Sequence, residues 1–275
     1  MNRLPIEKRA QIVGLLVEGM SMRAVTRITG VSINTVTKLL EDVGLAAGLY
    51  QAQVLVNLPC KRVECDEIWA FCYVKEKNVA PADKGVLGFG DVYTWTGMDA
   101  DSKLMVSYMV GKRDAEYANQ FIADLASRLK SRVQLTTDGH KPYLEAVEGA
   151  FGAEVDYAML VKHYGPGSVT DQRRYSPSEF VDSEKRVIMG NPNMKKVSTS
   201  YIERQNLTMR MGMRRFTRLT NGFSKKVENL EHAVSLHFMH YNFARIHKTL
   251  RVTPAMAVGI SDHVWSLEEI AALVD

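Results

Sequence analysis

The sequence predicts an α/β protein in which a mixed β-sheet is flanked by helices and preceded by a small all-α N-terminal domain. Residues 1–45 carry only the apolar spacing of helices, whereas residues 61–164 alternate between strand-like and helix-like stretches. Strands that alternate with helices form a sheet with helices on its faces. The chain of 275 residues is long enough to bury a large core around such a sheet.

The composition is that of a globular protein without a membrane partner. Hydrophobic residues make up 46% of the chain and charged residues 24%, which excludes a disordered or fibrous protein. The longest uncharged stretch, 43–60, is interrupted by polar residues and glycines, so no membrane span is expected. The first residues lack an apolar signal core, and three cysteines are few for the length. Both features favour the cytoplasm.

Residues 1–45 are expected to form three short helices. Ser21 and Ser32 are suited to cap the second and third helices, and Gly30 suits the left-handed residue that ends the second. Two helices joined by such a tight turn are typical of a helix-turn-helix domain. The exposed face of the third helix, which would enter a major groove, carries Asn34, Thr35 and Lys38. A purely structural three-helix module is the alternative. Residues 46–59 are expected to be a linker.

Local patterns place the later elements in order. Residues 63–74 are almost continuously apolar, as in a central strand, and strands at 92–99 and 103–110 form a hairpin. Asp114 caps a helix, which is followed by a strand at 133–137, a helix at 142–151 and a strand at 155–164. Residues 165–198 are expected to be a loop. Helices are expected at 200–213 and 227–247, with a last helix capped by Ser266.

Two carboxylates stand at strand positions where chemistry is expected. Asp66 interrupts the apolar run of the central strand together with Glu67, and Asp138 ends the strand at 133–137. If these strands run parallel and side by side, the two aspartates emerge together at the carboxyl end of the sheet. Two ionised carboxylates at close range repel each other and require a cation between them. Oxygen ligands favour Mg²⁺ or Mn²⁺.

The positive charge is concentrated in residues 195–226. This segment carries nine basic residues and one acid, a net charge of +8, although the whole chain carries only +4. Such a concentration suits a nucleic-acid partner, and a solvated basic helix face is the alternative. The residues of this region expected to contact DNA are Asn206, Arg210, Arg214, Arg215, Arg218, Lys225 and Lys226.

The single acid of the basic segment, Glu203, is the expected third metal ligand. On a helix it shares a face with Asn206, Arg210 and Arg214, so the carboxylate points toward the metal while the cations beside it hold a phosphate backbone. Spacing alone leaves other acids open for this role, namely Glu179, Glu184, Glu228 and Glu231.

Four stretches carry a resemblance to a known family. They are CDEIWAF (65–71), TTDGHKPY (136–143), TSYIERQNLTMRMGMRRFTRLTNGFSKK (199–226) and HFMHYNFARIHKTLRVTPAMA (237–257). With these motifs the chain resembles DDE transposases of bacterial insertion sequences, and closely the insertion-sequence-one family. The resemblance implies a ribonuclease-H-like catalytic domain over 60–260, followed by a C-terminal helix in 261–275.

The resemblance also implies an activity. Asp66, Asp138 and Glu203 would be both catalytic residues and ligands of two Mg²⁺ or Mn²⁺ ions. The enzyme would hydrolyse transposon ends, and the freed 3′-hydroxyls would attack target DNA. The implied partners are double-stranded DNA, as transposon ends and target, and further copies of the chain, in a dimer or higher homo-oligomer. The implied location is the bacterial cytoplasm, associated with the nucleoid.

Other functions fit the sequence less well. A catalytically inactive DNA-binding regulator of the same fold is the main alternative, and a nuclease acting on RNA hybrids is a third. A recombinase that uses Tyr201 as nucleophile would leave the paired aspartates without a role. The spacing of Cys60, Cys65 and Cys72, without a nearby histidine, favours buried thiols over a zinc site.

Overall fold

The computed structural model describes residues 3–165, 180–217 and 221–275. The strands are β1 (Arg62–Cys72), β2 (Gly90–Asp99), β3 (Met105–Gly111), β4 (Val133–Thr137), β5 (Val155–Tyr164) and β6 (Phe180–Met189). The α-helices are α1 (Ile6–Val17), α2 (Met22–Thr29), α3 (Ile33–Val54), α4 (Ala115–Arg128), α5 (Pro142–Phe151), α6 (Ser200–Gly212), α7 (Val227–Met239), α8 (Pro254–Ala257) and α9 (Leu267–Ala272).

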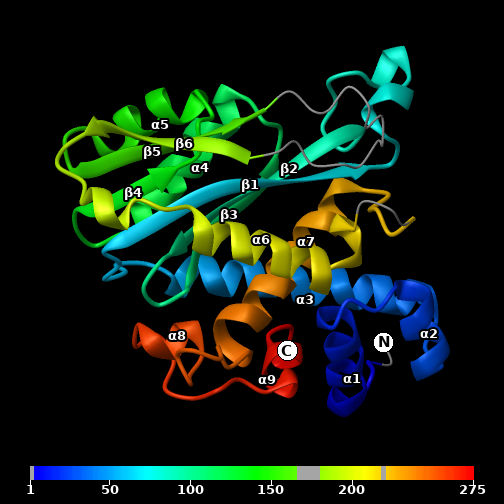
Figure 1. The fold of residues 1–275 in the computed structure, drawn as a ribbon. Coiled ribbons are helices and arrows are strands. Elements are labelled where there is room, and N and C mark those ends of the chain that lie inside the picture. Colours follow the sequence, from blue (N-terminus) through cyan, green and yellow to red (C-terminus); the bar gives the residue numbers. More distant parts are fainter. Residues whose placement is uncertain (1–2, 166–179, 218–220) are drawn as a thin grey trace.

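The six strands form one mixed sheet in the order β3-β2-β1-β4-β5-β6 (Figure 1). Strand β1 pairs antiparallel with β2 and parallel with β4, and β4 pairs parallel with β5. This order and these directions over the first five strands are those of a ribonuclease-H-like sheet, so the predicted fold class is confirmed. The apolar run predicted as a central strand is β1, which has neighbours on both sides.

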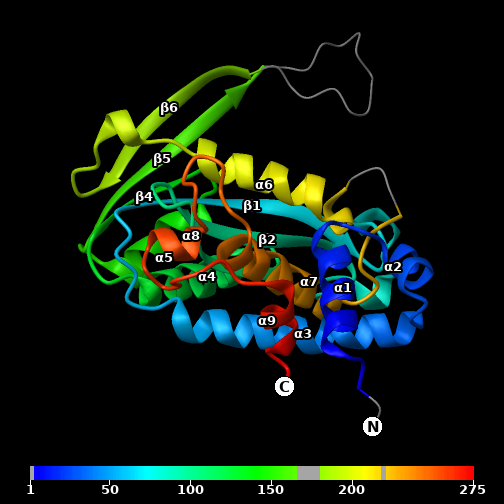
Figure 2. The same ribbon diagram turned by 90° about the horizontal axis from the view of Figure 1, so that it is seen from below.

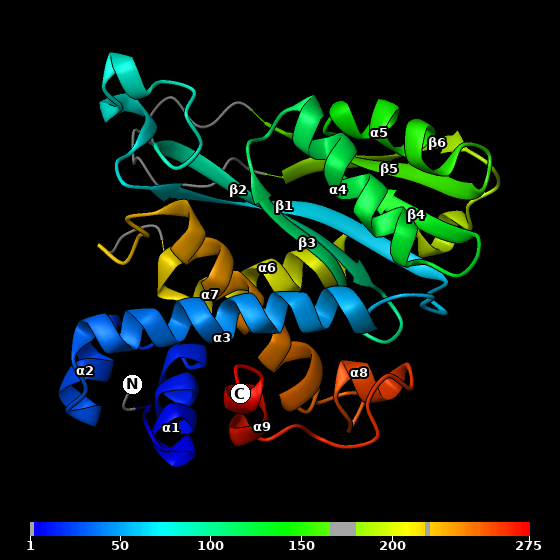
Figure 3. The same ribbon diagram turned by 180° about the vertical axis from the view of Figure 1, so that it is seen from behind.

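Helices cover both faces of the sheet (Figure 3). On one face Cys65 of β1 belongs to a buried cluster with Phe121 of α4. On the other face Ile68 of β1 packs in a second cluster with Ile202 and Met209 of α6. Alternate side chains of β1 thus pack into the two clusters on opposite faces of the sheet, because successive side chains of a strand point to opposite faces. The strand reads as continuously apolar for this reason.

The N-terminal helices begin where the sequence predicts, and α2 ends at the predicted glycine. The Ser21 and Ser32 hydroxyls accept hydrogen bonds from backbone N–H groups of α2 and α3, and Gly30 has φ 72°. The expected linker, however, is wrong over 46–54, because α3 continues to Val54. Val43 and Ala47 are fully buried and continue the four-residue spacing of the helix. The absence of charge in this stretch reflects burial against α7 rather than an irregular connection.

The expected loop at 165–198 is corrected in part. Residues 180–189 form β6, which pairs antiparallel with β5 at the sheet edge (Figure 2), and residues 166–179 lie outside the described residues. Nearly all side chains of β6 are exposed, so it has no buried apolar face that an alternating pattern would reveal. Backbone pairing with β5, which no local pattern encodes, makes it a strand.

The C-terminal segment returns to the N-terminal helices. Helix α9 begins with the predicted capping box of Ser266 and Glu269 and contacts α1. Arg9 is only 6% exposed, and its guanidinium forms an ion pair with the Asp275 carboxylate at 2.7 Å. Helix α7 ends at Met239, before the predicted end at 247, and passes into a π-helical turn, 240–244. Among the described residues, no helix has the length and apolar character needed to cross a bilayer.

A substitution tests the close crossing of α3 and α7. A Cβ added at Gly44 would lie 2.5 Å from the His232 carbonyl oxygen, so the two helices must separate. We expect Gly44→Ala to lower the free energy of unfolding by about 1–3 kcal/mol in urea denaturation. Gly149→Ala, at an exposed helical position with no atom within 4 Å, is the matched control and is expected to gain up to about 1 kcal/mol. Equal effects at both positions would contradict the close crossing.

Candidate metal and DNA-binding site

Three carboxylates meet where the parallel pairing of β1 with β4 ends. Asp66 lies in β1, Glu67 follows it, and Asp138 comes directly after β4. One oxygen from each lies within 4.8 Å of the others. The predicted proximity of Asp66 and Asp138 is therefore present, because β1 and β4 are parallel neighbours. Glu67, which the sequence left without a role, joins them.

The environment of this cluster favours a cation. Burial raises the pKa of Asp66 to about 6, and the neighbouring Asp138 adds to the shift. Burial and Asp138 together raise the pKa of Glu67 to about 7. The Glu67 side chain is 1% exposed, and Tyr143 and Arg113 offset part of the rise in its pKa. Partly buried carboxylates that repel one another fit a hard divalent ion such as Mg²⁺ or Mn²⁺.

Glu203 lies close to this cluster but is held by other partners. It stands in the first turn of α6, where its carboxylate forms an ion pair with Lys162 of β5 and accepts a hydrogen bond from Thr199. It is not among the three carboxylates within 4.8 Å of one another, although its charge contributes to the raised pKa of Asp66.

None of the alternative acids that the structure describes belongs to the cluster of three carboxylates. Glu184 lies on β6, whereas Glu228 and Glu231 lie on α7. Glu179 lies outside the described residues.

Two polar contacts dock α6 on β1. Asn206 is 4% exposed and its amide donates to Asp66 Oδ2 at 2.8 Å, so this side chain orients the carboxylate. The prediction that Asn206 contacts DNA does not fit this burial. Glu64, two residues before Asp66, accepts hydrogen bonds from the backbone N–H groups of Tyr201 and Ile202. This buried carboxylate, whose pKa burial raises to about 7, anchors the start of the helix that carries Glu203.

Arg113 is a site residue that the sequence reasoning missed. Its Nε donates to Glu67 Oε2 at 3.1 Å, and its Nη2 lies 3.5 Å from Asp138 Oδ2. Arg113 follows β3, which runs parallel to β1 because both are antiparallel to β2. The ends of β3 and β4 therefore lie on either side of Asp66 and Glu67 in the middle of β1. The position of this basic residue just after the strand predicted at 103–110 was the feature of the sequence that could have indicated its role.

The predicted DNA-contacting residues fall into two regions. Asn34, Thr35 and Lys38 lie exposed on α3, and Lys38 pairs with Asp42. In the basic segment Arg210 is partly exposed near the end of α6, while Lys225 and Lys226 are exposed before α7. Helix α6 ends at Gly212, so Arg214 and Arg215 lie in a separate 3-10 turn, η4 (Arg214–Phe216). The prediction that Arg214 shares a helical face with Glu203 is therefore wrong, and Arg218 lies outside the described residues.

Comparisons with known proteins find likeness in structure only. No protein-family model and no curated protein matches the chain. A Mos1 strand transfer complex is 15% identical, with a TM-score of 0.24 over 56% of this chain and 59% of that chain. A piggyBac transposase synaptic complex with hairpin DNA is 10% identical, with a TM-score of 0.44 over 98% of this chain and 69% of that chain. At these scores the fold rests on its own strand order, and the site on its own contacts.

The raised carboxylate pKa values predict a pH dependence of stability. Asp66 and Glu67 hold their protons up to about pH 6 and 7 in the folded protein but lose them near pH 4 when unfolded. The folded state therefore binds more protons between these values, so this stabilisation is complete below pH 4 and is lost as the pH rises through 7. In EDTA we expect the melting temperature to fall by several degrees between pH 5 and 8.

A double variant isolates this effect from other titrating groups. Asp66→Asn combined with Glu67→Gln removes both groups with raised pKa values. The melting temperature of this variant should therefore depend less on pH. Adding Mn²⁺ to the unsubstituted protein at pH 8 should restore most of the lost stability, because the ion replaces the protons. An identical pH slope in the two proteins would contradict the assignment.

Proposed function

We propose that the protein is a DNA transposase of the DDE type, which hydrolyses transposon ends and joins their 3′-hydroxyls to target DNA. The observation that carries this proposal is the meeting of Asp66 and Asp138 where the parallel pairing of the central strands β1 and β4 ends in a ribonuclease-H-like sheet. Helix α6, which bears Glu203 and part of the basic segment 195–226, packs against β1 beside these two residues. The likeness to the insertion-sequence-one motifs supports the same function. The names of the similar structures, Mos1 and piggyBac transposase complexes, agree with it.

Asp66, Asp138 and Glu203 are proposed to hold two divalent ions, with Glu67 beside them. When bound, Mg²⁺ or Mn²⁺ would stabilise the negative charge that develops on phosphate oxygens and lower the pKa of the attacking water or hydroxyl. Asn206 keeps the Asp66 carboxylate in one orientation through its amide. Lys162 forms an ion pair with the Glu203 carboxylate and Thr199 donates a hydrogen bond to it, so these two side chains orient it.

Other residues of the chain would bind and align the DNA. Arg113 neutralises part of the charge of Glu67 and Asp138 and is exposed enough to contact a phosphate beside them. The exposed cations Arg214, Lys225 and Lys226 suit a phosphate backbone. Asn34, Thr35 and Lys38 on α3 suit base edges in a major groove, since they lie on its exposed face. Two transposon ends must be aligned together, so we propose a dimer or higher homo-oligomer.

An end-joining assay tests the proposal. Purified protein is incubated with labelled double-stranded DNA carrying the element's ends, a target plasmid, and Mg²⁺ or Mn²⁺. We expect labelled strands joined to the plasmid and none in EDTA. Specific binding without any cleavage would favour the inactive regulator instead, and cleavage of an RNA–DNA hybrid without joining would favour a nuclease.

A further inference from the structure

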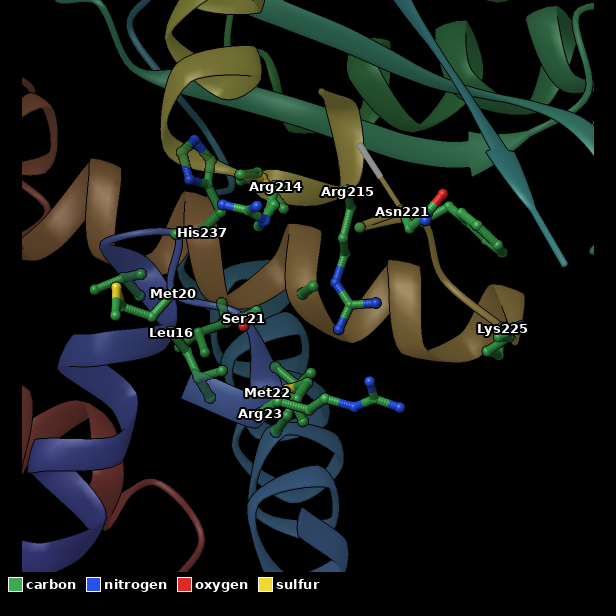
Figure 4. Close-up of a pocket in the computed structure, with 18 of the residues that line it drawn as sticks. Leu16, Met20, Ser21, Met22, Arg23, Arg214, Arg215, Asn221, Lys225 and His237 are labelled. Carbon is green, nitrogen blue, oxygen red and sulfur yellow. The ribbon is translucent and has the colours of Figure 1, made fainter. Parts of the chain in front are cut away.

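A cavity of about 740 Å³ separates the N-terminal helices from the segment that follows α6 (Figure 4). One wall comes from the α1–α2 connection and α2, and the opposite wall from η4, 221–225 and α7. In the described part of the chain, its lining residues include three arginines, one lysine and one histidine but no acid. A cavity of this size whose charged lining residues are all cations suits an anionic small molecule or one unit of a polymer.

Arg215 is the least exposed of the four cations among the described residues that line this cavity. Its guanidinium donates to the Ser224 hydroxyl, and within the described ranges no carboxylate forms an ion pair with it. Burial lowers its pKa to about 10, which measures the cost of keeping this cation away from water. Figure 4 shows Arg215 extending from η4 toward Arg23 of α2, with Arg214 beside the same cavity. An anion between these walls would offset that cost.

Most of the remaining lining is apolar, and Ser21, Asn221 and His237 are its uncharged polar side chains. Leu16, Met20 and Met22 form the wall on the side of the N-terminal helices. His237 lines the cavity with only 6% of its surface exposed, and its Nε2 has no hydrogen-bond partner among the described residues. Burial lowers the His237 pKa to about 3, so the ring is neutral at physiological pH. A neutral imidazole nitrogen beside an apolar wall matches the edge and the face of a nucleobase.

We propose that this cavity binds a single nucleotide, with its phosphate against Arg214 and Arg215, its base against the methionine wall, and the base edge toward His237. A phosphate ion alone would make no contact with the apolar wall, and an uncharged base would give Arg215 no anion with which to form an ion pair. The nucleotide has two possible sources, a free nucleoside monophosphate or an unpaired nucleotide of a DNA strand. The second source rests on the proposed function, since the cavity adjoins both predicted DNA-contacting regions.

Substitutions at Met20 test the cavity without removing a cation. Met20 is 37% exposed, so the fold tolerates a polar residue there. Met20→Glu places a carboxylate opposite the arginines and should weaken nucleotide binding about tenfold or more. Met20→Gln has nearly the same shape without the charge and should stay within about threefold of the unsubstituted protein. Lys61→Gln, which removes an exposed cation outside the lining, is the control for net charge.

The probe is 2-aminopurine deoxyribonucleoside monophosphate, followed by fluorescence in EDTA with the full chain. Inorganic phosphate and the uncharged nucleoside should compete weakly; phosphate that competes as well as the nucleotide would reduce the cavity to an anion site and overturn the proposal. A duplex with one unpaired 2-aminopurine is compared with a fully paired duplex. Preference for the unpaired duplex that Met20→Glu abolishes assigns the DNA source, whereas binding of the free nucleotide alone assigns the other.

The binding measurements do not depend on catalysis, because they are made in EDTA, which removes the metal ions that catalysis requires. If Met20→Glu and Met20→Gln bind every probe alike, the inference fails even where strand joining succeeds. If the probes bind as expected but no joined product ever forms with metal, the nucleotide site stands and the proposed transposase function fails.

Discussion

Asp138→Asn is expected to abolish metal-dependent cleavage and strand joining while leaving DNA binding intact. The change keeps the shape of the side chain and the hydrogen bond from the His140 backbone N–H, but it removes the charge that would bind the ion. Loss of about 4 kcal/mol of transition-state stabilisation corresponds to a fall of about 10³-fold in rate. Joined products and bound DNA are measured on the same preparation, by gel electrophoresis and by anisotropy.

Asp101→Asn is the matched control for this substitution. Asp101 is an exposed aspartate at the β2–β3 turn that pairs with Arg62, and an ion pair of this kind contributes little. It should retain full joining activity. If Asp138→Asn joins ends as well as Asp101→Asn does, the carboxylate cluster is not the catalytic centre. If neither protein nor the unsubstituted chain cleaves DNA, the inactive regulator is the better description.

Trp95→Ala is expected to cause the largest loss of stability. Trp95 is fully buried on β2, its Nε1 donates to the Lys112 carbonyl at 3.0 Å, and its ring packs against Phe121 and Tyr143. Removing this side chain leaves a cavity under the sheet and an unpaired carbonyl, at a cost of about 3–5 kcal/mol. Urea denaturation monitored by circular dichroism measures the change in free energy of unfolding.

The same substitution should weaken metal binding indirectly. The Trp95 ring lies 5.8 Å from the His140 ring, centroid to centroid, and the His140 backbone N–H donates to Asp138. Trp95→Phe, which keeps much of the ring volume, should lose clearly less stability. Trp69→Ala, at a residue of β1 that is only partly buried, is a second comparison. If Trp69→Ala lowered the free energy of unfolding as much as Trp95→Ala does, the expected larger contribution of Trp95 to stability would be contradicted.

Much of the fold was predictable because its signals are local. The cap residues Ser21, Ser32, Asp114 and Ser266 each accept the N–H bond expected of them, and β4 ends at Thr137, directly before Asp138. Each signal lies within a few residues of the element that it bounds. Where burial arose from a distant partner, the prediction failed, as in the expected linker that continues α3.

The composition of the site was only partly predictable. Asp66 and Asp138 were found because an acid in an apolar strand and an acid at a strand end are conspicuous along the chain. Glu64, Arg113 and Lys162 were missed, since each acts on a residue at least 25 positions away in the sequence. Asn206 was assigned to DNA because helical spacing gives the face of a residue but not the neighbour that covers that face.

The amino-acid sequence by itself therefore determined the order of most helices and strands, the concentration of positive charge in 195–226 and the two aspartates of the cluster. Only the tertiary structure decided that Glu67 and Arg113 join that cluster, that Lys162 holds Glu203, and that β6 exists. Caps and apolar periods are encoded within one or two turns of chain. The partners of a buried charge depend on strand pairing and helix docking between segments that are distant in sequence.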